Sequence, residues 1–432
     1  MSSPASFCAI DFGTSNSAIA IPHEGSMRLV ELEGGQQTMP TAVFYYVDGR
    51  HDADGPPRAF GRAAIAAYVD GIDGRLMRSM KSILGSGLIE QTTDVGGGRG
   101  VKYFDILAGY LKRLRNSALA AGASTSMKQV VLGRPVFFVD GEPARDAAAQ
   151  ASLEAAARAV GFDEVHFQFE PIAAAFDYES GIKREEIVLV ADIGGGTSDF
   201  SVVRVGPQRM QRIDRRDDIL ANHGVHIAGT DFDRHVELAS ILREFGYRSI
   251  GPPRKGAPAR EVPSAVYFDL ATWHLINTVY SPLRVAELRQ MRSFYGSALH
   301  HQRLMTVLEE RLGHELAARA ESAKIAVSGG GDTLIDLDMV EPGLQILLSE
   351  AVAIDALDSD INRIVQAGRD AVAQAGLKPE QISALYFTGG STGLRLLAER
   401  IAADYPAAAH VKGDRFASVA TGLGLHAARL FR

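Results

Sequence analysis

The chain has 432 residues, enough for two or more domains with sizeable hydrophobic cores. Its 45 basic and 52 acidic residues give a net charge of −7 without a long basic run, so charge favours neither nucleic acid nor anionic lipid as a partner. The N-terminus lacks the pattern of a signal peptide, no apolar run approaches about 18 residues, and Cys8 is the only cysteine. We therefore expect a cytoplasmic protein without a membrane span or an internal disulfide, and we expect Cys8 to be buried.

The first informative stretch is C-A-I-D-F-G-T-S-N-S-A-I-A, from Cys8 to Ala20, where two apolar strands flank a turn. Asp11 ends the first strand, and the turn contains Gly13, Thr14, Ser15 and Asn16. The sequence then predicts strands over 27–47, a polar loop over 48–57, helices over 63–69, 76–84 and 104–121, a strand over 130–139 and a helix over 142–160. In F-Q-F-E-P-I-A-A-A-F-D-Y, from Phe167 to Tyr178, Glu170 precedes a proline that suits the first position of a helix. This carboxylate can therefore face a cleft.

The second informative stretch is V-A-D-I-G-G-G-T-S-D-F-S, from Val190 to Ser201. Apolar runs precede and follow its three glycines, so it predicts a strand, a turn and a second strand. Only glycine lets backbone amides turn outward and approach a phosphate closely. Asp192 and Asp199 flank the turn and would suit the magnesium of a nucleotide better than a bare phosphate.

The rest of the chain predicts a turn over 224–233 that enters a helix, an exposed loop over 246–263, helices over 265–328, a strand over 334–337, and one or two helices over 344–375. In A-L-Y-F-T-G-G-S-T-G-L-R-L-L-A-E-R-I, from Ala384 to Ile401, a buried strand leads through two glycines into a helix. Such a junction suits a ribose or a phosphate. A strand near Val411 and a helix over 418–430 complete the chain.

The two glycine hairpins repeat one design about 180 residues apart. Asp11 matches Asp192, and Gly13 matches Gly194. Two similar half-sites predict two similar lobes with a nucleotide between them.

Five motifs occur in the order found in the ATPase domain of the Hsp70 (DnaK-type) chaperones, which belongs to the actin, sugar kinase and Hsp70 ATPase superfamily. They are I-D-F-G-T-S-N-S, F-E-P-I-A-A-A-F-D-Y, V-A-D-I-G-G-G-T-S-D-F, G-x-x-x-x-G-T-D-F-D and F-T-G-G-S-T. A sixth stretch, A-E-S-A-K-I-A-V-S, resembles the helix that holds adenosine in that family. The chain resembles the short Hsp70-like proteins that consist of the ATPase unit without a peptide-binding domain. The resemblance implies an α/β fold of two actin-like lobes, each a mixed sheet flanked by helices, that close over ATP or ADP and Mg²⁺.

The resemblance also implies roles for individual residues. Asp11 and Asp192 would hold magnesium mainly through its waters, and Glu170 and Asp199 would position or deprotonate the attacking water, with Asp11 and Thr197 also in the catalytic set. The residues that would contact the nucleotide are Gly13, Thr14, Ser15, Asn16, Gly194, Gly195, Gly196, Thr197, Gly229, Glu321, Lys324, Ser328, Gly389, Gly390 and Ser391.

Four positions depart from the family pattern. Ile65 stands where the resemblance places a catalytic lysine, and Arg75, Arg78 and Lys81 are the candidate substitutes. Gly133 replaces a threonine. Ile325 and Gly393 replace two arginines near the adenosine, which predicts weaker binding or weaker selection of the base.

The sequence predicts lobe I over 1–186 with a small insertion at about 41–100, lobe II over 187–411 with a helical insertion at about 226–343, and a C-terminal helix over 412–432 that returns to lobe I. The segment 248–302 is the candidate surface for a protein partner, although added packing is an alternative for its length.

The leading hypothesis is a magnesium-dependent, slow ATPase whose lobes close with nucleotide state, in a chaperone-related role. One alternative is a nucleotide-binding scaffold or sensor with little turnover, which Ile65 and Gly133 motivate. Less favoured are a small-molecule kinase of the same superfamily, for which the first lobe shows no convincing substrate-facing aspartate, and an actin-like filament.

Overall fold

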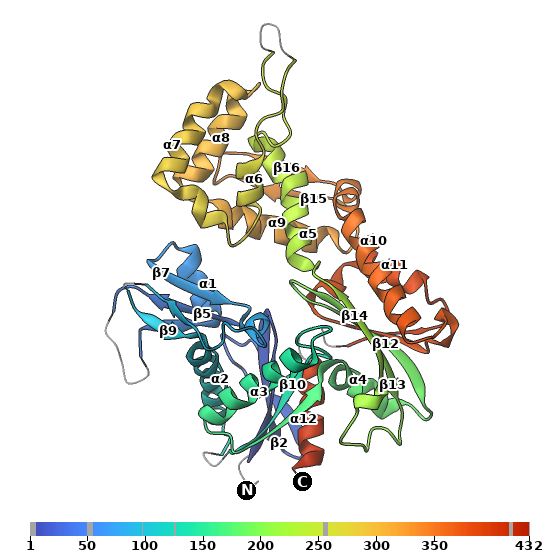
Figure 1. Ribbon diagram of the computed structural model, residues 1–432. Helices are drawn as coiled ribbons and strands as arrows, with labels where there is room; N and C mark the ends of the chain where they lie inside the picture. Colours follow the sequence, from blue (N-terminus) through green and yellow to red (C-terminus); the bar gives the residue numbers. More distant parts are fainter. Residues whose placement is uncertain are drawn as a thin grey trace.

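The computed structural model describes residues 6–49, 55–96, 98–124, 127–253, 258–413 and 418–431. Two sheets form its base (Figure 1). The first has the strand order β11-β10-β1-β2-β3, with β4 also paired to β2: β1 (Phe7–Phe12), β2 (Asn16–His23), β3 (Ser26–Leu29), β4 (Met39–Pro40), β10 (Gln129–Arg134) and β11 (Glu164–Phe169). The second has the order β14-β13-β12-β17-β18: β12 (Glu186–Ile193), β13 (Ser198–Val205), β14 (Ile219–Val225), β17 (Ala384–Thr388) and β18 (Ala409–Lys412). We call the parts built on these sheets lobe I and lobe II.

The two sheets have the same topology. In each, three consecutive strands form an antiparallel meander, β1-β2-β3 in lobe I and β12-β13-β14 in lobe II. The first strand of each meander then pairs in parallel with a later strand, which pairs in parallel with a second one, β10 and β11 or β17 and β18. The duplication predicted from the two hairpins is therefore present in the strand order, and it gives both hairpins equivalent places.

Helices cover the sheets on both faces, which is why β1 and β12 are almost continuously apolar. They are α2 (Tyr103–Ala120), α3 (Pro143–Ala159), α4 (Glu170–Gly181), α10 (Glu350–Gln374), α11 (Arg395–Ala403) and α12 (Ser418–Leu430). The last helix, α12, contacts β1, β2, β3 and β10 of lobe I and also packs on α4. A Cβ at Gly422 of α12 would lie 1.9 Å from the carbonyl oxygen of Ala173 in α4, so glycine is required where these helices meet.

The insertion of lobe I is a small sheet of order β6-β5-β7 with a helix on it: β5 (Ala42–Tyr46), β6 (Arg58–Phe60), α1 (Gly61–Val69), β7 (Gly74–Arg78), the 3₁₀ helix η1 (Met80–Ile83), β8 (Thr92–Asp94) and β9 (Gly100–Lys102). The helix predicted over 76–84 is wrong, because β7 pairs with β5 from Ala42 to Tyr46. Tertiary pairing overrides the local helical spacing there. Part of the loop predicted over 48–57 lies outside the described residues, as does Gly97.

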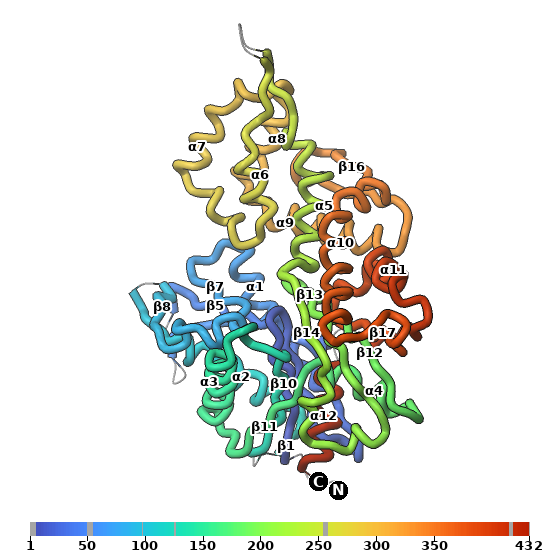
Figure 2. Tube along the Cα trace, turned by 45° about the vertical axis from the view of Figure 1, so that its right-hand side comes forward, coloured from blue at the N-terminus to red at the C-terminus, as the bar shows by residue number. Residues whose placement is uncertain are grey.

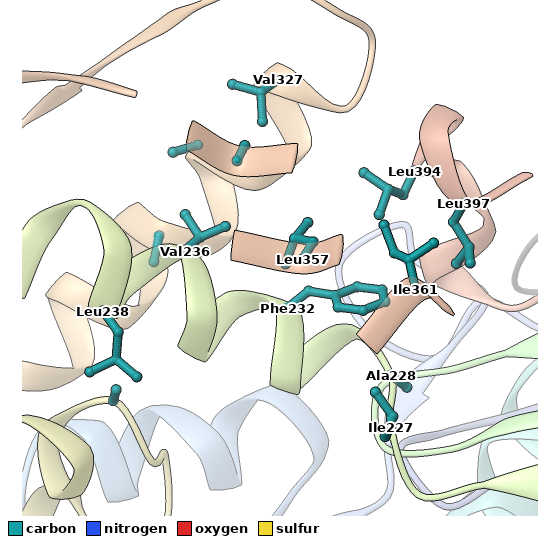
Figure 3. Packing of buried hydrophobic residues seen from close by; sticks show 14 of the residues in the cluster. Ile227, Ala228, Phe232, Val236, Leu238, Val327, Leu357, Ile361, Leu394 and Leu397 are labelled. Atoms are coloured by element: carbon teal, nitrogen blue, oxygen red, sulfur yellow. The ribbon is translucent and has the colours of Figure 1, made fainter. Parts of the chain in front are cut away.

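The insertion of lobe II is mainly helical: α5 (Gly229–Ala239), η3 (Ile241–Phe245), α6 (Ala265–Leu270), η4 (Ile276–Tyr280), α7 (Pro282–Gln290), η5 (Met291–Phe294), α8 (Ala298–Glu309), α9 (Gly313–Val327), β15 (Thr333–Asp336) and β16 (Gln345–Leu348). The helix predicted from 344 is wrong for its first residues, because β16 pairs with β15 there. Phe232 of α5 lies beside Leu357 and Ile361 of α10 in the core, which fixes the start of α5 against lobe II (Figure 3). Among the described residues, no helix is both long and apolar enough to cross a membrane.

His426 of α12 provides a test of how the lobe I core responds to acid. It is 4% exposed, stacks on Phe176 at 6.0 Å and contacts Gln168. Burial, with Arg429 and Arg215 nearby, lowers its pKa to about 4. A lowered histidine pKa gives stability that is complete above the unfolded value near 6.5 and is lost as pH falls through the folded value.

We predict that His426→Gln removes up to about 3 kcal/mol of the stability that the wild type loses between about pH 7 and about pH 4. Urea unfolding at both pH values measures this difference. His410→Gln, at an exposed position of β18, is the control and should keep the wild-type loss. Equal losses in the wild type and in His426→Gln would contradict the prediction.

Candidate functional site

Hydrogen bonds to backbone carbonyl groups hold the turns of both glycine hairpins in place. In lobe I, the Thr41 hydroxyl donates to the Gly13 carbonyl at 2.8 Å, and the Thr41 amide donates to the Ser15 carbonyl at 2.9 Å. In lobe II, the Thr230 amide and hydroxyl donate to the Gly195 carbonyl at 2.8 and 2.7 Å. Each hairpin is thus anchored by a threonine that follows it in the chain.

The Gly194 carbonyl is anchored in the same way. It accepts from the Gly229 amide at 3.2 Å and from the Ser391 hydroxyl at 2.7 Å. Because these carbonyls point toward the start of α5 and the 3₁₀ helix η7 (Gly390–Gly393), the amides of Gly195 and Gly196 make no hydrogen bond within the described part of the chain. Free amides of this kind are what a phosphate oxygen needs.

The two hairpins face each other across the lobes. A Cβ at Gly195 would lie only 3.1 Å from the Ser15 hydroxyl, so the second turn passes very close to the first. Thr14 and Thr197 are half-buried, whereas Asn16 is exposed and pairs with Pro40. The structure therefore brings together the hydroxyl and glycine residues of both turns.

Four carboxylates converge beside the hairpins. Asp11 comes from β1, Glu170 from the start of α4, Asp192 from β12 and Asp199 from β13. Burial, the charge of Glu170 and the charge of Asp192 raise the pKa of Asp11 to about 8. Burial, Asp199 and Glu170 raise the pKa of Asp192 to about 7. Burial also raises the pKa of Asp199, against a hydrogen bond from Thr197 that lowers it. Burial and mutual repulsion thus make it costly to ionise these carboxyl groups, and a bound cation would favour their ionised forms.

Lys81 supplies one positive charge to this cluster. Its ammonium lies 2.5 Å from Glu170 Oε1, and the two side chains are only 10% and 15% exposed. Burial opposes the charged form of Lys81, but Glu170 and Asp11 outweigh it and raise its pKa. The lysine therefore stays protonated among the carboxylates at neutral pH.

This result distinguishes the three candidate substitutes for the lysine that Ile65 replaces. Ile65 lies on α1 and packs against a small apolar cluster that includes Ala64 and Phe44, away from the carboxylates. Of the three candidate substitutes, Arg75 donates to the Asp94 carbonyl and Arg78 lies over the Trp273 ring. Only Lys81 reaches the site, because η1 carries it back toward α4.

Gly133 touches the site from β10. A Cβ there would lie 3.3 Å from Glu170 Cγ, 3.4 Å from Glu170 Oε1 and 3.0 Å from Leu423 of α12. A larger residue would push Glu170 or α12 aside. The glycine is thus compatible with the close pairing of Glu170 and Lys81.

Gly389 lies directly against the end of β12, where the second hairpin begins. It has a φ of 85°, and a Cβ would lie 2.4 Å from the Ile193 carbonyl oxygen and 2.7 Å from Asp192 Oδ1. Neither the backbone conformation nor the space admits a side chain. The F-T-G-G-S-T motif thus packs directly against β12, the strand that carries Asp192. Gly390 is the first residue of η7.

The predicted adenosine residues lie on α9 at one side of these turns. Lys324 forms an ion pair with Asp233 at 2.6 Å, and its ammonium lies 3.4 Å from the Gly229 carbonyl oxygen. Glu321 is exposed, and Ile325 is 60% exposed. The Ser328 carbonyl accepts the Arg395 amide at 3.3 Å, which ties α9 to the segment after Gly393.

Sequence reasoning did not single out Thr41, Thr230, Asp233 or Arg395. Thr230 stands within the quoted G-T-D-F-D motif, so its place beside a glycine turn was a usable signal. Thr41 has no local signal, because only the pairing of β4 with β2 brings it to the first hairpin. The guanidinium of Arg395 forms ion pairs with the carboxylates of Glu350 at 2.9 Å and Glu399 at 3.1 Å.

The donor set fits a hydrated magnesium ion. Among the described residues, no three His, Cys, Asp or Glu side chains come close enough together to ligate a metal directly. Magnesium usually keeps several waters and takes one or two carboxylates together with substrate phosphates. Asp11 and Asp192, with their raised pKa values, suit that role.

Two duplicated lobes, each presenting an anchored glycine turn and a carboxylate, define the two-lobed nucleotide-binding fold shared by actin, sugar kinases and Hsp70 ATPase domains. The chain matches the family model described as Hsp70 protein over residues 7–249, more than half of its length, and it belongs to that family.

Curated relatives agree with this assignment. The "Chaperone protein HscA" of Salmonella newport (strain SL254) and that of Salmonella agona (strain SL483) are each 24% identical over 402 residues. The matched region covers 91% of this chain and 53% of each relative. The chain therefore spans about half the length of the curated relatives that it matches.

The carboxylate cluster predicts that groups suited to bind a cation lower the stability of the protein without a cation. Asp192→Asn removes one of the four clustered carboxyl groups, so we expect the metal-free and nucleotide-free protein to melt about 1–3 °C higher than the wild type. The gain should be larger at about pH 8 than at about pH 5, because a raised carboxyl pKa costs stability as pH rises through its folded value.

Differential scanning calorimetry checks this prediction. Asp163→Asn, at a 70% exposed side chain, is the matched control and should leave the melting temperature unchanged. A lower melting temperature for Asp192→Asn at about pH 8 would mean that Asp192 is stabilising as a charge.

Proposed function

We propose that this protein binds ATP and ADP with Mg²⁺ between its lobes and hydrolyses ATP slowly, with lobe closure as the output. The observation that carries the proposal is Lys81, a buried cation among four carboxylates beside two glycine turns. A cation and an amide cradle around an acidic centre are the parts that phosphoryl transfer requires. The name of these relatives, chaperone protein HscA, supports a chaperone-related role for the nucleotide cycle.

The phosphates would lie against the free amides of Gly195 and Gly196, with Gly13, Thr14, Ser15, Asn16, Gly194 and Thr197 completing the cradle. Asp11 and Asp192 would hold the metal through water. Bound Mg²⁺ would supply neutralisation of phosphate charge. Anchoring of the turn carbonyls by Thr41 and Thr230 keeps the amides oriented before the nucleotide arrives, so little reorganisation is needed.

Glu170 and Asp199 would orient the attacking water and accept its proton. Glu170 accepts a hydrogen bond from Lys81, so its oxygen is fixed in place. Asp199 has a raised pKa, which makes it a better proton acceptor than an ordinary aspartate. The ammonium of Lys81 would stabilise negative charge as it develops on the transferred phosphoryl group.

The sugar and base would lie between η7 and α9. Gly389, Gly390 and Ser391 would pass beside the ribose, and Gly229, Glu321, Lys324 and Ser328 would face it. Ile325 offers the base an exposed apolar surface in place of a guanidinium group. Selection of adenine over other bases should therefore be weaker than an arginine clamp would give.

Hydrolysis is favoured over the scaffold alternative because the position of Lys81 answers one of the two reasons for that alternative, the absence of a lysine at Ile65; Gly133 is the other. Lys81 of η1, which pairs with Glu170, would take the place of that lysine. The kinase alternative has no specific support from the described residues. We also propose that the chain divides into lobe I (1–186), lobe II (187–411) and a C-terminal helix (412–432) that returns to lobe I.

The segment 248–302 is our proposed surface for a protein partner. It holds seven basic and three acidic residues in a chain of net charge −7, and residues 254–257 lie outside the described residues. Large apolar side chains are exposed on it: Ile250, Phe268, Leu283, Phe294 and Leu299. Charge complementarity favours a partner that presents an acidic segment with apolar anchors.

We predict that a photo-crosslinker at position 283 attaches to an acidic segment of a partner protein, which mass spectrometry identifies. A photo-crosslinker at position 213, where Ile213 of lobe II is exposed, should not attach to that segment.

Two substitutions test the proposed chemistry. We predict that Lys81→Ala and Asp199→Asn each lower the single-turnover rate of phosphate release by about 100-fold, since each removes a group that acts in the transition state. The affinity for Mg-ATP, measured by calorimetry, should change far less than the rate.

Lys128→Ala is the matched control, because Lys128 is 51% exposed and pairs with Asp163 at the surface. Its turnover should equal that of the wild type. Tight binding of Mg-ATP by the wild type without measurable turnover would favour the scaffold alternative, and absence of binding would overturn the proposed function.

A further inference from the structure

The two-stranded sheet of β15 and β16 carries large apolar side chains on both of its faces. On the inner face, Ile335 and Leu348 are buried in the core of lobe II. On the outer face, Leu334 and Leu347 lie directly opposite each other in the strand register and are 64% and 61% exposed. Val352 of α10 is 42% exposed and lines the same hollow as Leu347. Strands that are apolar on both faces are typical of sheets covered on both sides, so the outer face is suited to a partner.

Negative charge surrounds this outer face. Residues 332–352 contain five acidic residues and no Lys, Arg or His. Asp332, Asp336 and Asp338 are exposed, and their carboxylates accept hydrogen bonds from backbone amides. None of these three carboxylates pairs with a basic side chain in the described part of the chain. We call residues 332–352 the acidic hairpin.

The stretch formed by α7 and η5 has the opposite charge. Residues 282–294 contain three arginines and one acidic residue, in a chain of net charge −7. Leu283 is 75% exposed and Phe294 is 38% exposed. Arg292 is also exposed and forms no ion pair with the residues that the structure describes. We call residues 282–294 the basic helix surface; it is part of the 248–302 surface proposed above for a protein partner.

The two surfaces lie on opposite sides of the helical insertion of lobe II. In Figures 1 and 2, α7 lies on the left of the insertion and β16 on the right. Leu288 of α7 and Leu348 of β16 belong to the same hydrophobic core, so the insertion holds both surfaces in fixed places. The acidic hairpin therefore cannot reach the basic helix surface of its own molecule.

A hollow of about 410 Å³ adjoins the outer face of the acidic hairpin. It lies between β16, the end of α5, η3 and the start of α10, and Leu347 and Val352 line it together with Arg243 and Glu244. A hollow of this volume has room for a large side chain of a partner.

We propose that the chain associates head to tail with a second copy of itself, so that the basic helix surface of one copy docks on the acidic hairpin of the next. This inference rests on the proposed partner surface and names its partner, but it does not depend on ATP hydrolysis. Charge complementarity selects the occupant, because the basic helix surface suits an acidic segment with exposed apolar side chains and every copy of the chain presents one. Exposed Leu283 and Phe294 would then meet Leu334, Leu347 and the hollow.

The two surfaces of this contact differ, so it is heterologous. A pair of copies joined in this way keeps one free surface of each kind, and association continues to a ring or to an open chain. A symmetric dimer, in which the same surface serves both copies, has neither property.

Sedimentation velocity of the 432-residue protein tests association. We expect the average mass to rise above that of the monomer between about 1 and about 100 µM protein at low salt. Raising the salt from about 50 to about 500 mM should raise the apparent dissociation constant about tenfold, because exposed charges are screened.

Two variants each remove one side of the contact. Leu283→Glu changes the basic helix surface, and Leu347→Glu changes the acidic hairpin; both positions are exposed, so circular dichroism should show wild-type folding. Each variant alone should stay monomeric. An equimolar mixture should form a heterodimer and nothing larger, since the Leu347→Glu copy supplies an intact basic helix surface and the Leu283→Glu copy an intact acidic hairpin. Ile213→Glu, at a 65% exposed position outside both surfaces, should associate as the wild type does.

The results that would overturn the inference are equally definite. They are a wild type that stays monomeric at about 100 µM in low salt, unchanged association of both single variants, or a mixture that forms no heterodimer. A photo-crosslink from position 283 to a different protein in place of residues 332–352 of a second copy would also overturn it.

Calorimetric titration of the same samples with Mg-ATP separates this inference from the proposed function. Both variants should bind Mg-ATP as the wild type does, because positions 283 and 347 lie outside the carboxylate cluster and the glycine turns. Loss of self-association with intact binding would leave the proposed function standing, whereas association without binding of Mg-ATP would overturn the proposed function and leave the head-to-tail contact standing.

Discussion

The concentration of negative charge at the ends of β1, β12 and β13 is the constraint on which the rest of the molecule depends. The fold holds four carboxylates that repel one another close together, and burial together with that repulsion raises the pKa values of Asp11 and Asp192. Such an arrangement lowers the stability of the empty protein. A cation and a charged ligand would complete this site when they bind. The lower stability of the empty protein is then a consequence of the site's function.

The fold offsets this repulsion with rigid supports. Lys81 brings one positive charge to Glu170 from a separate insertion. Threonines anchor the carbonyls of both glycine turns, and Gly389 and Gly133 let neighbouring strands approach the carboxylates without side chains between them. The result is a site whose amides and carboxylates are oriented before any ligand binds, which the proposed hydrolysis of ATP would require.

The duplicated topology explains how the molecule can be rigid at its centre and still move. Lobe I and lobe II each have a sheet and a hydrophobic core, and a third core is shared by the two sheets and by α4 and α12, the helices that follow the last strand of each sheet and pack on each other at one end. At the other end the lobes meet through Tyr68, Arg78, Trp273 and His314. A tightly packed helix pair at one end and a side-chain contact at the other suit the lobe closure that we propose.

The sequence by itself determined the duplication, the two glycine hairpins and the carboxylates beside them. These features are local: apolar runs, glycine triplets and aspartates at fixed offsets specify strand, turn and charge without help from distant residues. Family membership and fold class followed from the order of such motifs. Elements with strong local periodicity, including α2, α3 and α12, were also predicted nearly to their ends.

Only the tertiary structure decided which cation reaches the carboxylates. Arg75, Arg78 and Lys81 lie within seven residues and look equivalent in the sequence, yet β7 and η1 direct them to a backbone carbonyl, to Trp273 of the other lobe and to Glu170. The strand pairing that sets these directions joins residues about 30 positions apart, so local spacing read the segment as a helix. The stacked rings of Tyr68 and Trp273 likewise join residues more than 200 positions apart, and no local pattern marks such a contact.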